Sequence, residues 1–229
     1  MADWIAFFDT DHALYVNARH KAAHARLTGD CLRAYIHDGE DVLDYGCGEA
    51  AYAENLARGL NRLLLCEAAP NLRERLAARV AKIPNIAVLA PDAAEALPDA
   101  CLDVAILHSV SQYLSPALTG DLFRLFRRLL RPGGRLIVGD VVPPDASALS
   151  EALALLRFGA REGFLIAAFG GLARTALSDY SRLRRSAGLT RYAQDDMQNK
   201  LTAAGFAARR ASRNIGHLQN RMTFVAEPV

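Results

Sequence analysis

The sequence is poor in cysteine, and its few cysteines are scattered. None forms a Cys-x-x-Cys pair, and no histidine lies at a spacing that would complete a zinc site. This pattern excludes a zinc centre and a disulfide framework from the expected architecture, and it predicts a reduced, cytoplasmic protein without a metal. The four residues are Cys31, Cys47, Cys66 and Cys101.

Long apolar runs are also missing. A membrane-spanning helix needs about 20 consecutive apolar residues, whereas the nearest candidate, residues 164–173, has charged residues on both sides. The first residues, Met1 to Trp4, are acidic and lack the basic-then-apolar pattern of a secretion signal. We therefore expect neither a spanning segment nor a targeting segment.

Neither sign of charge dominates the chain. Its 27 basic and 25 acidic residues give a net charge of +2, without the strong basic excess of a dedicated nucleic-acid binder. No internal repeat or low-complexity linker divides the sequence. With 229 residues, 52 % of them apolar, the chain is expected to form one domain around one sizeable core.

Short apolar segments alternate with helical stretches along most of the chain. The segments have the near-continuous apolar character of strands buried on both faces. A strand–helix–strand alternation is typical of a parallel sheet with helices on both sides, so the predicted fold class is α/β with a doubly wound sheet. Strands are expected at residues 41–45, 62–66, 85–89, 102–107 and 135–142, and helices at 10–37, 49–60, 70–82 and 116–130.

Residues 145–192 break this alternation. They are very apolar and mostly helical in pattern, and the stretch is too long for a plain connection. We expect a helical insertion that covers the C-terminal edge of the sheet. A helix at 193–204 follows, and two last strands at 206–213 and 222–226 are expected to form an antiparallel pair with a turn at 214–220.

The strongest chemical signal is a Gly-x-Gly turn in residues 44–48, between the first strand and the next helix. Its glycines let the backbone approach a ligand closely, and the helix start offers free N–H groups. The Gly-x-Gly-x-x-Gly of dinucleotide sites and the P-loop are both absent, which argues against an NAD-dependent oxidoreductase. Glu67 ends the second strand and Asp92-Ala93 follows the third, where carboxylates can bind ribose hydroxyls and an adenine amino group. The pattern indicates a nucleoside ligand without a phosphate.

Together these segments resemble the class I S-adenosylmethionine (SAM)-dependent methyltransferases, a seven-stranded Rossmann-like superfamily. The matching stretches, in the family's order and spacing, are residues 44–48, 66–72, 90–98, 102–114 and 129–140. The resemblance implies a single domain over residues 1–229 with an antiparallel last strand. Its expected parts are an N-terminal helical cap (1–38), a SAM-binding core (39–142), a helical insertion or lid (145–192) and a C-terminal helix and strand pair (193–229).

The resemblance also implies a cofactor site. The expected contacts are Asp44, Gly46, Cys47 and Gly48 beside the methionine part, Glu67 at the ribose, Asp92 and Ala93 at the adenine, His108 and Ser109 at the end of the fourth strand, and Tyr15 and Arg19 from the N-terminal helix. In this role Arg19 would pair with the methionine carboxylate and Tyr15 would pack on the site. A solvated helix face is the alternative for both. The family's third loop glycine is replaced by Ala50.

Methyl transfer to a hydroxyl or an amine also requires the loss of a proton, for which histidine is suited near neutral pH. His108 is the candidate catalytic base because it ends the fourth strand, and a packing or cofactor-contacting role is the alternative. The other histidines are expected on a solvated helix face (His20), in the last turn (His217, with Asn214) or on the surface (His12, His24 and His37).

The insertion bears on the substrate. Its apolar side chains suit a lid packed on the sheet, the lining of a pocket for an apolar acceptor, or, beside a basic cluster, contact with an anionic membrane surface. The apolar residues are Leu153, Leu155, Leu156, Phe158, Phe164, Leu165, Ile166, Phe169 and Leu172, and the basic ones are Arg174, Arg182, Arg184, Arg185 and Arg191.

We therefore expect a SAM-dependent methyltransferase that acts on oxygen or nitrogen of a small, apolar acceptor and releases S-adenosylhomocysteine (SAH). The alternatives are a membrane-associated lipid methyltransferase and a non-catalytic SAM-binding partner subunit. A nucleic-acid substrate is not expected, because no Asn-Pro-Pro-Tyr-type motif follows the fourth strand, where residues 108–111 read His-Ser-Val-Ser.

Overall fold

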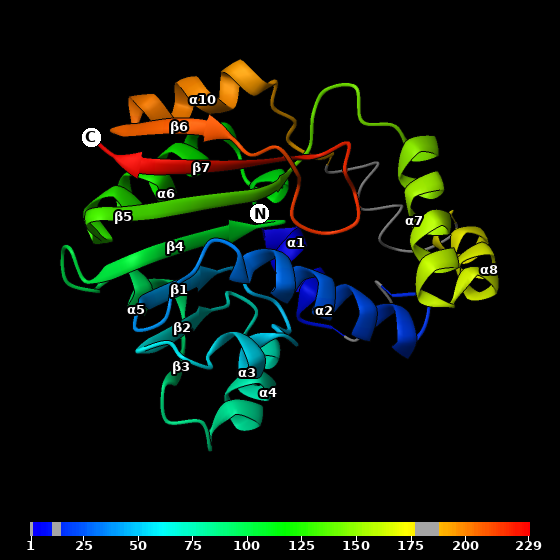
Figure 1. Cartoon of the computed structure of the whole chain (residues 1–229), viewed down its shortest axis with the longest axis horizontal. Helices are drawn as coiled ribbons and strands as arrows, with labels where there is room; N and C mark the ends of the chain where they lie inside the picture. The colour runs from blue at the N-terminus through cyan, green and yellow to red at the C-terminus, as the bar shows by residue number, and fades with distance from the viewer. Residues whose placement is uncertain (1, 11–14, 177–187) are drawn as a thin grey trace.

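A computed structural model describes residues 2–10, 15–176 and 188–229. Its centre is a seven-stranded sheet in the order β3-β2-β1-β4-β5-β7-β6 (Figure 1). The strands are β1 (Asp41–Tyr45), β2 (Arg62–Cys66), β3 (Ile86–Leu89), β4 (Leu102–His108), β5 (Leu130–Val141), β6 (Phe206–Arg210) and β7 (Met222–Pro228). The predicted doubly wound sheet and the antiparallel last strand are confirmed, because β7 runs antiparallel to both β5 and β6.

The order of the strands reverses between β1 and β4. From β1 the chain adds β2 and β3 on one side, and it then returns to place β4 and β5 on the other side, all of them parallel. Ligands of open α/β sheets bind outside the carboxyl ends of the strands at such a switch point. The topology therefore fixes where a site should form.

Helices cover both faces of the sheet, and three of them begin with proline at a first-turn position, where the missing N–H costs nothing. The elements are α1 (Ala2–Phe8), α2 (Ala18–Arg33), α3 (Ala53–Leu56), α4 (Pro70–Val80), α5 (Pro91–Glu95), the 3₁₀ turn η1 (Ser111–Tyr113), α6 (Pro116–Leu129), α7 (Ala148–Glu162), α8 (Leu165–Ala176) and α10 (Gln194–Ala203). One apolar core packs β-sheet residues against α6 and α10, and a second packs the opposite face against α2, α3 and α4.

Two predicted helices are shorter in the structure. The one expected at 10–37 begins at Ala18, where the side chain of Asn17 accepts from the backbone N–H of His20 and caps the helix. The one expected at 49–60 is reduced to α3. Ala50 has a φ of +40°, which no right-handed helix tolerates, so the chain stays in turns until Ala53.

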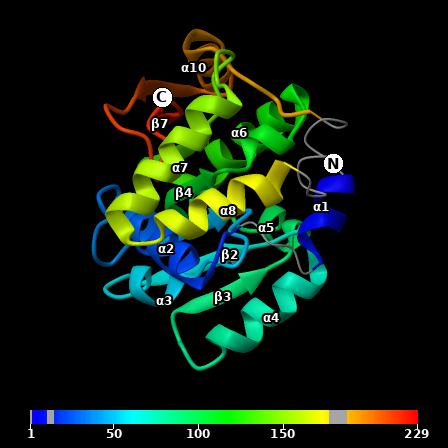
Figure 2. The same ribbon diagram turned by 90° about the vertical axis from the view of Figure 1, so that its right-hand side faces the viewer.

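The insertion is helical, as predicted. Helices α7 and α8 form a hairpin beyond the carboxyl ends of the strands and next to α2 (Figures 1 and 2). The turn between them uses Gly163 in the left-handed region, with φ +75°. Phe158 and Phe164 are buried with Ala23 of α2 in a small separate core. The helical character of the insertion is therefore confirmed, and its role as a lid stays a prediction.

The outer side of this hairpin is apolar. Leu149, Leu153, Ile166 and Phe169 are all exposed, Ile166 by 90 %. Of the predicted basic cluster, Arg182, Arg184 and Arg185 lie outside the described residues. Arg191 is exposed, and its guanidinium donates to the carbonyl oxygens of Pro144 and Ala146. In the part of the chain that the structure describes, no helix combines the length and the apolar character needed to cross a bilayer.

Candidate functional site

A large cavity lies at the switch point. Its volume is about 1330 Å³, more than the roughly 300–1,000 Å³ of a site for one small ligand. The walls come from the segments that follow β1, β2 and β4, from the end of β5, and from α1, α2 and α6. The space is therefore large enough for a cofactor and an acceptor side by side.

The glycine loop forms one wall of the cavity. The N–H groups of Gly46 and Cys47 both donate to the carbonyl oxygen of Cys66, at 2.8 and 3.1 Å, which holds the loop against the end of β2. Gly46 has a φ of +73°, and a Cβ atom there would lie 2.5 Å from a methyl carbon of Val110. Only glycine fits this position without strain.

Glu67 is held ready to bind hydroxyl groups. Its two carboxylate oxygens accept from the backbone N–H groups of Gly48 (2.8 Å) and Ala69 (2.9 Å), and the side chain lines the cavity. A carboxylate has about four lone-pair positions, so two remain for a ligand. The bond to Gly48 also ties the glycine loop to the predicted ribose residue.

Asp44 lies beneath the loop and is completely buried. Burial raises the pKa of this carboxyl to about 6, although the hydroxyl of Tyr52 donates to it at 2.7 Å. Burial also raises the pKa of the Cys47 thiol well above its ordinary value, so this residue stays protonated. Asp44 and Glu67 put negative charge beside the cavity, which suits a cationic ligand such as a sulfonium.

The residues after β3 that line the cavity are not the ones that were predicted. Asp92 and Ala93 lie in the first turn of α5 and are exposed, whereas Pro91 and Glu95 line the cavity. A role of Asp92 and Ala93 at an adenine ring thus stays a prediction. The segment as a whole borders the cavity where the adenine was expected.

The two site residues predicted in the N-terminal helical region, Tyr15 and Arg19, lie in different places. Tyr15 lines the cavity, and burial raises the pKa of its phenol to about 12. Arg19 does not line it: its Nε donates to the carbonyl oxygen of Glu162 at 2.7 Å, and its guanidinium packs against Gly163. In this structure the side chain of Arg19 contacts the insertion, so its pairing with the methionine carboxylate stays a prediction that the cavity lining does not support.

His108 and Ser109 line the cavity, and their contact with the cofactor stays a prediction. His108 is turned toward β5, since a Cβ atom on Gly139 would lie 2.6 Å from its Nδ1. This nitrogen is buried and has no hydrogen-bond partner among the described residues, while Nε2 lies 3.4 Å from the hydroxyl of Ser109. Burial lowers the pKa of His108 to about 4.

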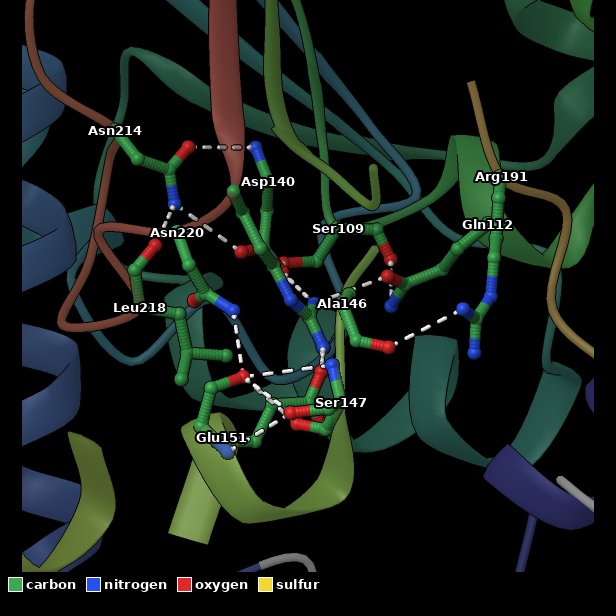
Figure 3. Close-up of polar contacts among 12 residues, drawn as sticks. Ser109, Gln112, Asp140, Ala146, Ser147, Glu151, Arg191, Asn214, Leu218 and Asn220 are labelled. Atoms are coloured by element: carbon green, nitrogen blue, oxygen red, sulfur yellow. Dashed lines mark hydrogen bonds and ion pairs between the residues drawn. The ribbon is translucent and has the colours of Figure 1, made fainter. Parts of the chain in front are cut away.

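A buried polar network, absent from the sequence prediction, begins at Ser109, the residue that follows His108 (Figure 3). Asp140 accepts from Ser109 Oγ at 2.7 Å and from Arg221 at 2.6 Å, and Arg221 also donates to Glu151 at 2.7 Å and to Gln112 at 3.0 Å. Ser109 and Asp140 have positive φ values of 59° and 62°. Strain of this kind persists only where the surroundings impose it, and it is common at functional sites.

The network keeps Asp140 ionised. Burial alone would raise the pKa of this carboxyl, but the charge of Arg221 and the hydrogen bonds from Ser109 and Asn214 outweigh burial and leave the pKa below its ordinary value. Asn214 is buried and donates to Asp140 at 3.3 Å. It is therefore part of the cavity wall's support, and its assignment as a plain turn residue is wrong.

Four histidines gather at the same end of the cavity: His20 and His24 from α2, His108 from β4, and His217 from the segment between β6 and β7. The ring centroids of His20, His24 and His217 lie 5.9–6.3 Å from one another. His24 was expected on the surface and His217 in a turn far from the site. Both expectations are wrong, because both residues line the cavity. No group of histidine, cysteine and acidic side chains in the described residues is arranged to hold a metal ion.

A signal for part of this cluster was present in the sequence. His20 and His24 are four residues apart, and the residues of α2 that line the cavity are His20, Lys21, His24, Ala25 and Thr28, which form one helix face. The contribution of His217 could not be foreseen, because it depends on how the last hairpin folds back over the sheet.

Comparisons with known proteins identify a methyltransferase domain in the part of the chain that contains the glycine loop. Residues 43–138 match the model of a methyltransferase domain family. No curated protein matches the chain. Among solved structures, 1,6-didemethyltoxoflavin-N1-methyltransferase from Burkholderia thailandensis, with bound 1,6-didemethyltoxoflavin and SAH, is 17 % identical with a TM-score of 0.62, and the match covers 100 % of this chain and 86 % of that one.

Two further structures are similar at the same level. A putative methyltransferase in complex with the Trm112 methyltransferase activator of Haloferax volcanii is 15 % identical (TM-score 0.63, 96 % of this chain and 97 % of that one). PigF with SAH is 18 % identical (TM-score 0.55), and the match covers 82 % of this chain and 50 % of PigF. At these identities the likeness shows a shared fold.

The family match spans β1 to the middle of β5, and it contains the glycine loop, Glu67 and His108 that line the cavity. Residues 43–138 therefore form a methyltransferase domain of the class I SAM-dependent type, for which SAM is the methyl donor.

Proposed function

We propose that this protein, in the cytoplasm, transfers the methyl group of SAM to oxygen or nitrogen of a small, largely apolar and planar acceptor. The observation that carries the proposal is the large cavity, which joins the glycine loop to a second region large enough for an acceptor. The second region has one apolar wall and one wall of histidines. This combination suits a flat molecule with a polar edge.

The cofactor would occupy the half of the cavity next to β1 and β2. There the backbone of residues 46–48 would lie beside its methionine part and Glu67 would bind its ribose, with the segment 91–95 near its adenine. Bound SAM supplies an activated methyl group on a sulfonium. The residues of the chain then have to orient the acceptor and exclude water.

The acceptor would lie against apolar side chains of α1, η1 and α6. The rings of Trp4 and Tyr113 are 4.5 Å apart, and Phe8 lies 5.4 Å from Tyr113; all three line the cavity, as do Leu118 and Leu122. None of the described residues of the insertion is among the lining residues. The apolar character of the acceptor is therefore supported by the N-terminal helix and α6, and the insertion serves as a lid.

The test follows a labelled methyl group. Pure protein is incubated with methyl-labelled SAM and an extract of its source cells, and the lipid, small-molecule, protein and nucleic-acid fractions are counted. Label in small, organic-soluble compounds is expected. Label confined to protein or nucleic acid would contradict the acceptor, and no label in any fraction despite SAH binding would favour the non-catalytic partner subunit.

A membrane-associated lipid methyltransferase is the second candidate, favoured by the exposed apolar side of α7 and α8. Arg157 and Arg161 are exposed on the same hairpin as Leu153, Ile166 and Phe169, and apolar groups next to cations bind anionic membrane surfaces. Sedimentation with vesicles of phosphatidylglycerol tests it. Cosedimentation that is lost in Ile166→Ser, together with label in the lipid fraction, would make this the better assignment.

A further inference from the structure

The inference concerns the proton that the acceptor loses, and it rests on the proposed function. A hydroxyl or amine nitrogen that takes a methyl group must give up a proton during or after the transfer. His108 is poorly placed to accept it. Ser109 Oγ donates to Asp140, so its oxygen accepts from Nε2–H of His108, and the free lone pair of His108 then lies on Nδ1, which is sealed against Gly139.

His20 is closed at both ring nitrogens, and His217 is closed at one. The backbone N–H of Val16 donates to Nδ1 of His20 at 3.3 Å, and Nε2 of that ring is buried. His217 lies flat on Phe158, with centroids 4.8 Å apart and an interplanar angle of 8°, and its Nδ1 is buried. Both rings are fixed by their neighbours, and each has at least one nitrogen closed off from the cavity.

His24 differs from the other three. It lines the cavity and is only half-buried, no nitrogen of its ring is among the sealed atoms, and no hydrogen bond to its ring is present in the described part of the chain. His20, His217 and Tyr15 surround it at centroid distances of 5.5–6.3 Å. These neighbours hold the ring in place and leave its nitrogens open.

His24 also faces the cofactor loop. The neighbouring residue on α2, Lys21, forms an ion pair with Glu49 directly after the glycine loop. Burial lowers the pKa of His24, and the negative charge of Asp140 opposes this shift because it favours the protonated form of the ring. Because Arg221, Ser109 and Asn214 keep Asp140 ionised, a fixed negative charge is ready to stabilise an imidazolium.

We propose that His24 is the catalytic base, with His20 and His217 as positioning residues. As the bond from the acceptor oxygen or nitrogen to the methyl carbon forms, the bond from that carbon to sulfur breaks and its electron pair stays on sulfur. The proton of the acceptor passes to the open nitrogen of His24. The positive charge thus moves from the sulfonium to the imidazole, and the net charge of the site is unchanged.

The test compares His24→Ala with His108→Gln and with His37→Ala, a matched change at an exposed residue away from the cavity. The readout is the rate of label transfer from methyl-labelled SAM into the source-cell extract, with the SAH dissociation constant measured by calorimetry. Loss of a general base typically costs about 10²–10⁴ in rate. His24→Ala should lose at least about a hundredfold, regain part of it with added imidazole, and keep its SAH affinity.

A chemical readout is independent of turnover. Diethyl pyrocarbonate acylates open, neutral imidazole nitrogens, and peptide mass spectrometry of the SAH-loaded protein should find His24 modified well before His20, His108 and His217. Near wild-type transfer by His24→Ala, or modification of His108 before His24, would overturn the inference alone. A wild-type protein that binds SAH and moves no label would overturn the proposed function, and the inference with it.

Discussion

At the scale of single residues, two glycines with nearly the same backbone conformation face different surroundings. Gly46 has a φ of +73° and Gly39 a φ of +81°, but a Cβ atom on Gly46 would meet Val110, whereas one on Gly39 would meet nothing within 4 Å. Val110 is β-branched and cannot easily turn away. An alanine at Gly39 would therefore add backbone strain alone, whereas an alanine at Gly46 would add both strain and a steric conflict.

We expect Gly39→Ala to lower the free energy of unfolding by about 1–2 kcal/mol, the cost of a left-handed alanine. Gly46→Ala should lose about 1–3 kcal/mol more, since it adds a steric conflict, and it should also weaken SAH binding. Urea denaturation and calorimetry measure both. Adding Val110→Ala to Gly46→Ala should recover part of the stability, and equal losses in the two single variants would show that the close approach is unimportant.

Glu67 gives a second prediction at this scale. In Glu67→Gln an amide NH₂ must replace one oxygen that now accepts from Gly48 or Ala69, so a backbone donor loses its partner and the ribose loses a charged acceptor. Hydrogen bonds to charged groups contribute about 1.5–3 kcal/mol, and SAH should bind at least about tenfold more weakly. Glu74→Gln, on the exposed side of α4, is the matched control, and equal affinities would remove Glu67 from the site.

At the scale of elements, a small apolar core and polar contacts near both ends of α7 hold the insertion. The polar contacts include the ion pairs of Arg221 with Glu151 and of Arg26 with Glu162. Phe158 packs against Phe164 at 5.4 Å and on His217 at 4.8 Å, and Arg19 donates to the end of α7. This core is separate from the two that enclose the sheet. The hairpin can therefore loosen while the cofactor half of the cavity stays intact.

Phe158→Ala tests this independence. Loss of a buried phenylalanine costs about 3–5 kcal/mol in a well-packed core, and here we expect the loss to appear as local opening of α7 and α8. Hydrogen exchange and limited proteolysis of the hairpin should speed up, while the SAH affinity changes little. Phe169→Ala, which removes a ring that is 58 % exposed, should leave both unchanged; equal effects of the two variants would contradict the lid.

The elements also show how far the sequence could predict the molecule. Strands β1 and β2 and the start of α4 were predicted at their observed residues, because apolar runs and a helix-starting proline are local signals. The positions of Arg19 and His24 relative to the cavity could not be predicted, for the opposite reason. Which side of α2 meets the cavity depends on the α7–α8 hairpin and on the segment around His217, more than a hundred residues away.

The same limit applies to Asp140 and Arg221. In the sequence Asp140 is one residue of a buried strand and Arg221 precedes the last strand, so neither carries a motif. Antiparallel pairing of β7 with β5 brings them together. A contact of this kind depends on which strands pair and in what register. Local sequence patterns predict the fold class but not this pairing.

At the scale of the whole molecule, burial around one cavity shifts the pKa values of histidines down and that of an aspartate up. Burial lowers the pKa of His20, His108 and His217 to about 4 and also lowers that of His24. The charged groups that act on His108 and His217 are Asp140 and Arg221, and Glu49 acts on the nearby Tyr15. Asp44 behaves in the opposite way, because its pKa is raised to about 6.

The linkage between protonation and folding gives the last prediction. Between pH 6.5 and 4 the unfolded chain binds protons on these histidines and the folded chain does not, so acid favours unfolding by at most about 1.4 kcal/mol per pH unit for each histidine. Asp44 works against this between about pH 6 and 4, since the folded state keeps its proton there. With more histidines than carboxyls shifted in this way, the free energy of unfolding should fall as the pH falls from 6.5 to 4. Urea denaturation across this range measures it, and replacing His108 by Gln should make the pH dependence shallower; a slope unchanged by that replacement would mean that His108 is not held neutral by the fold.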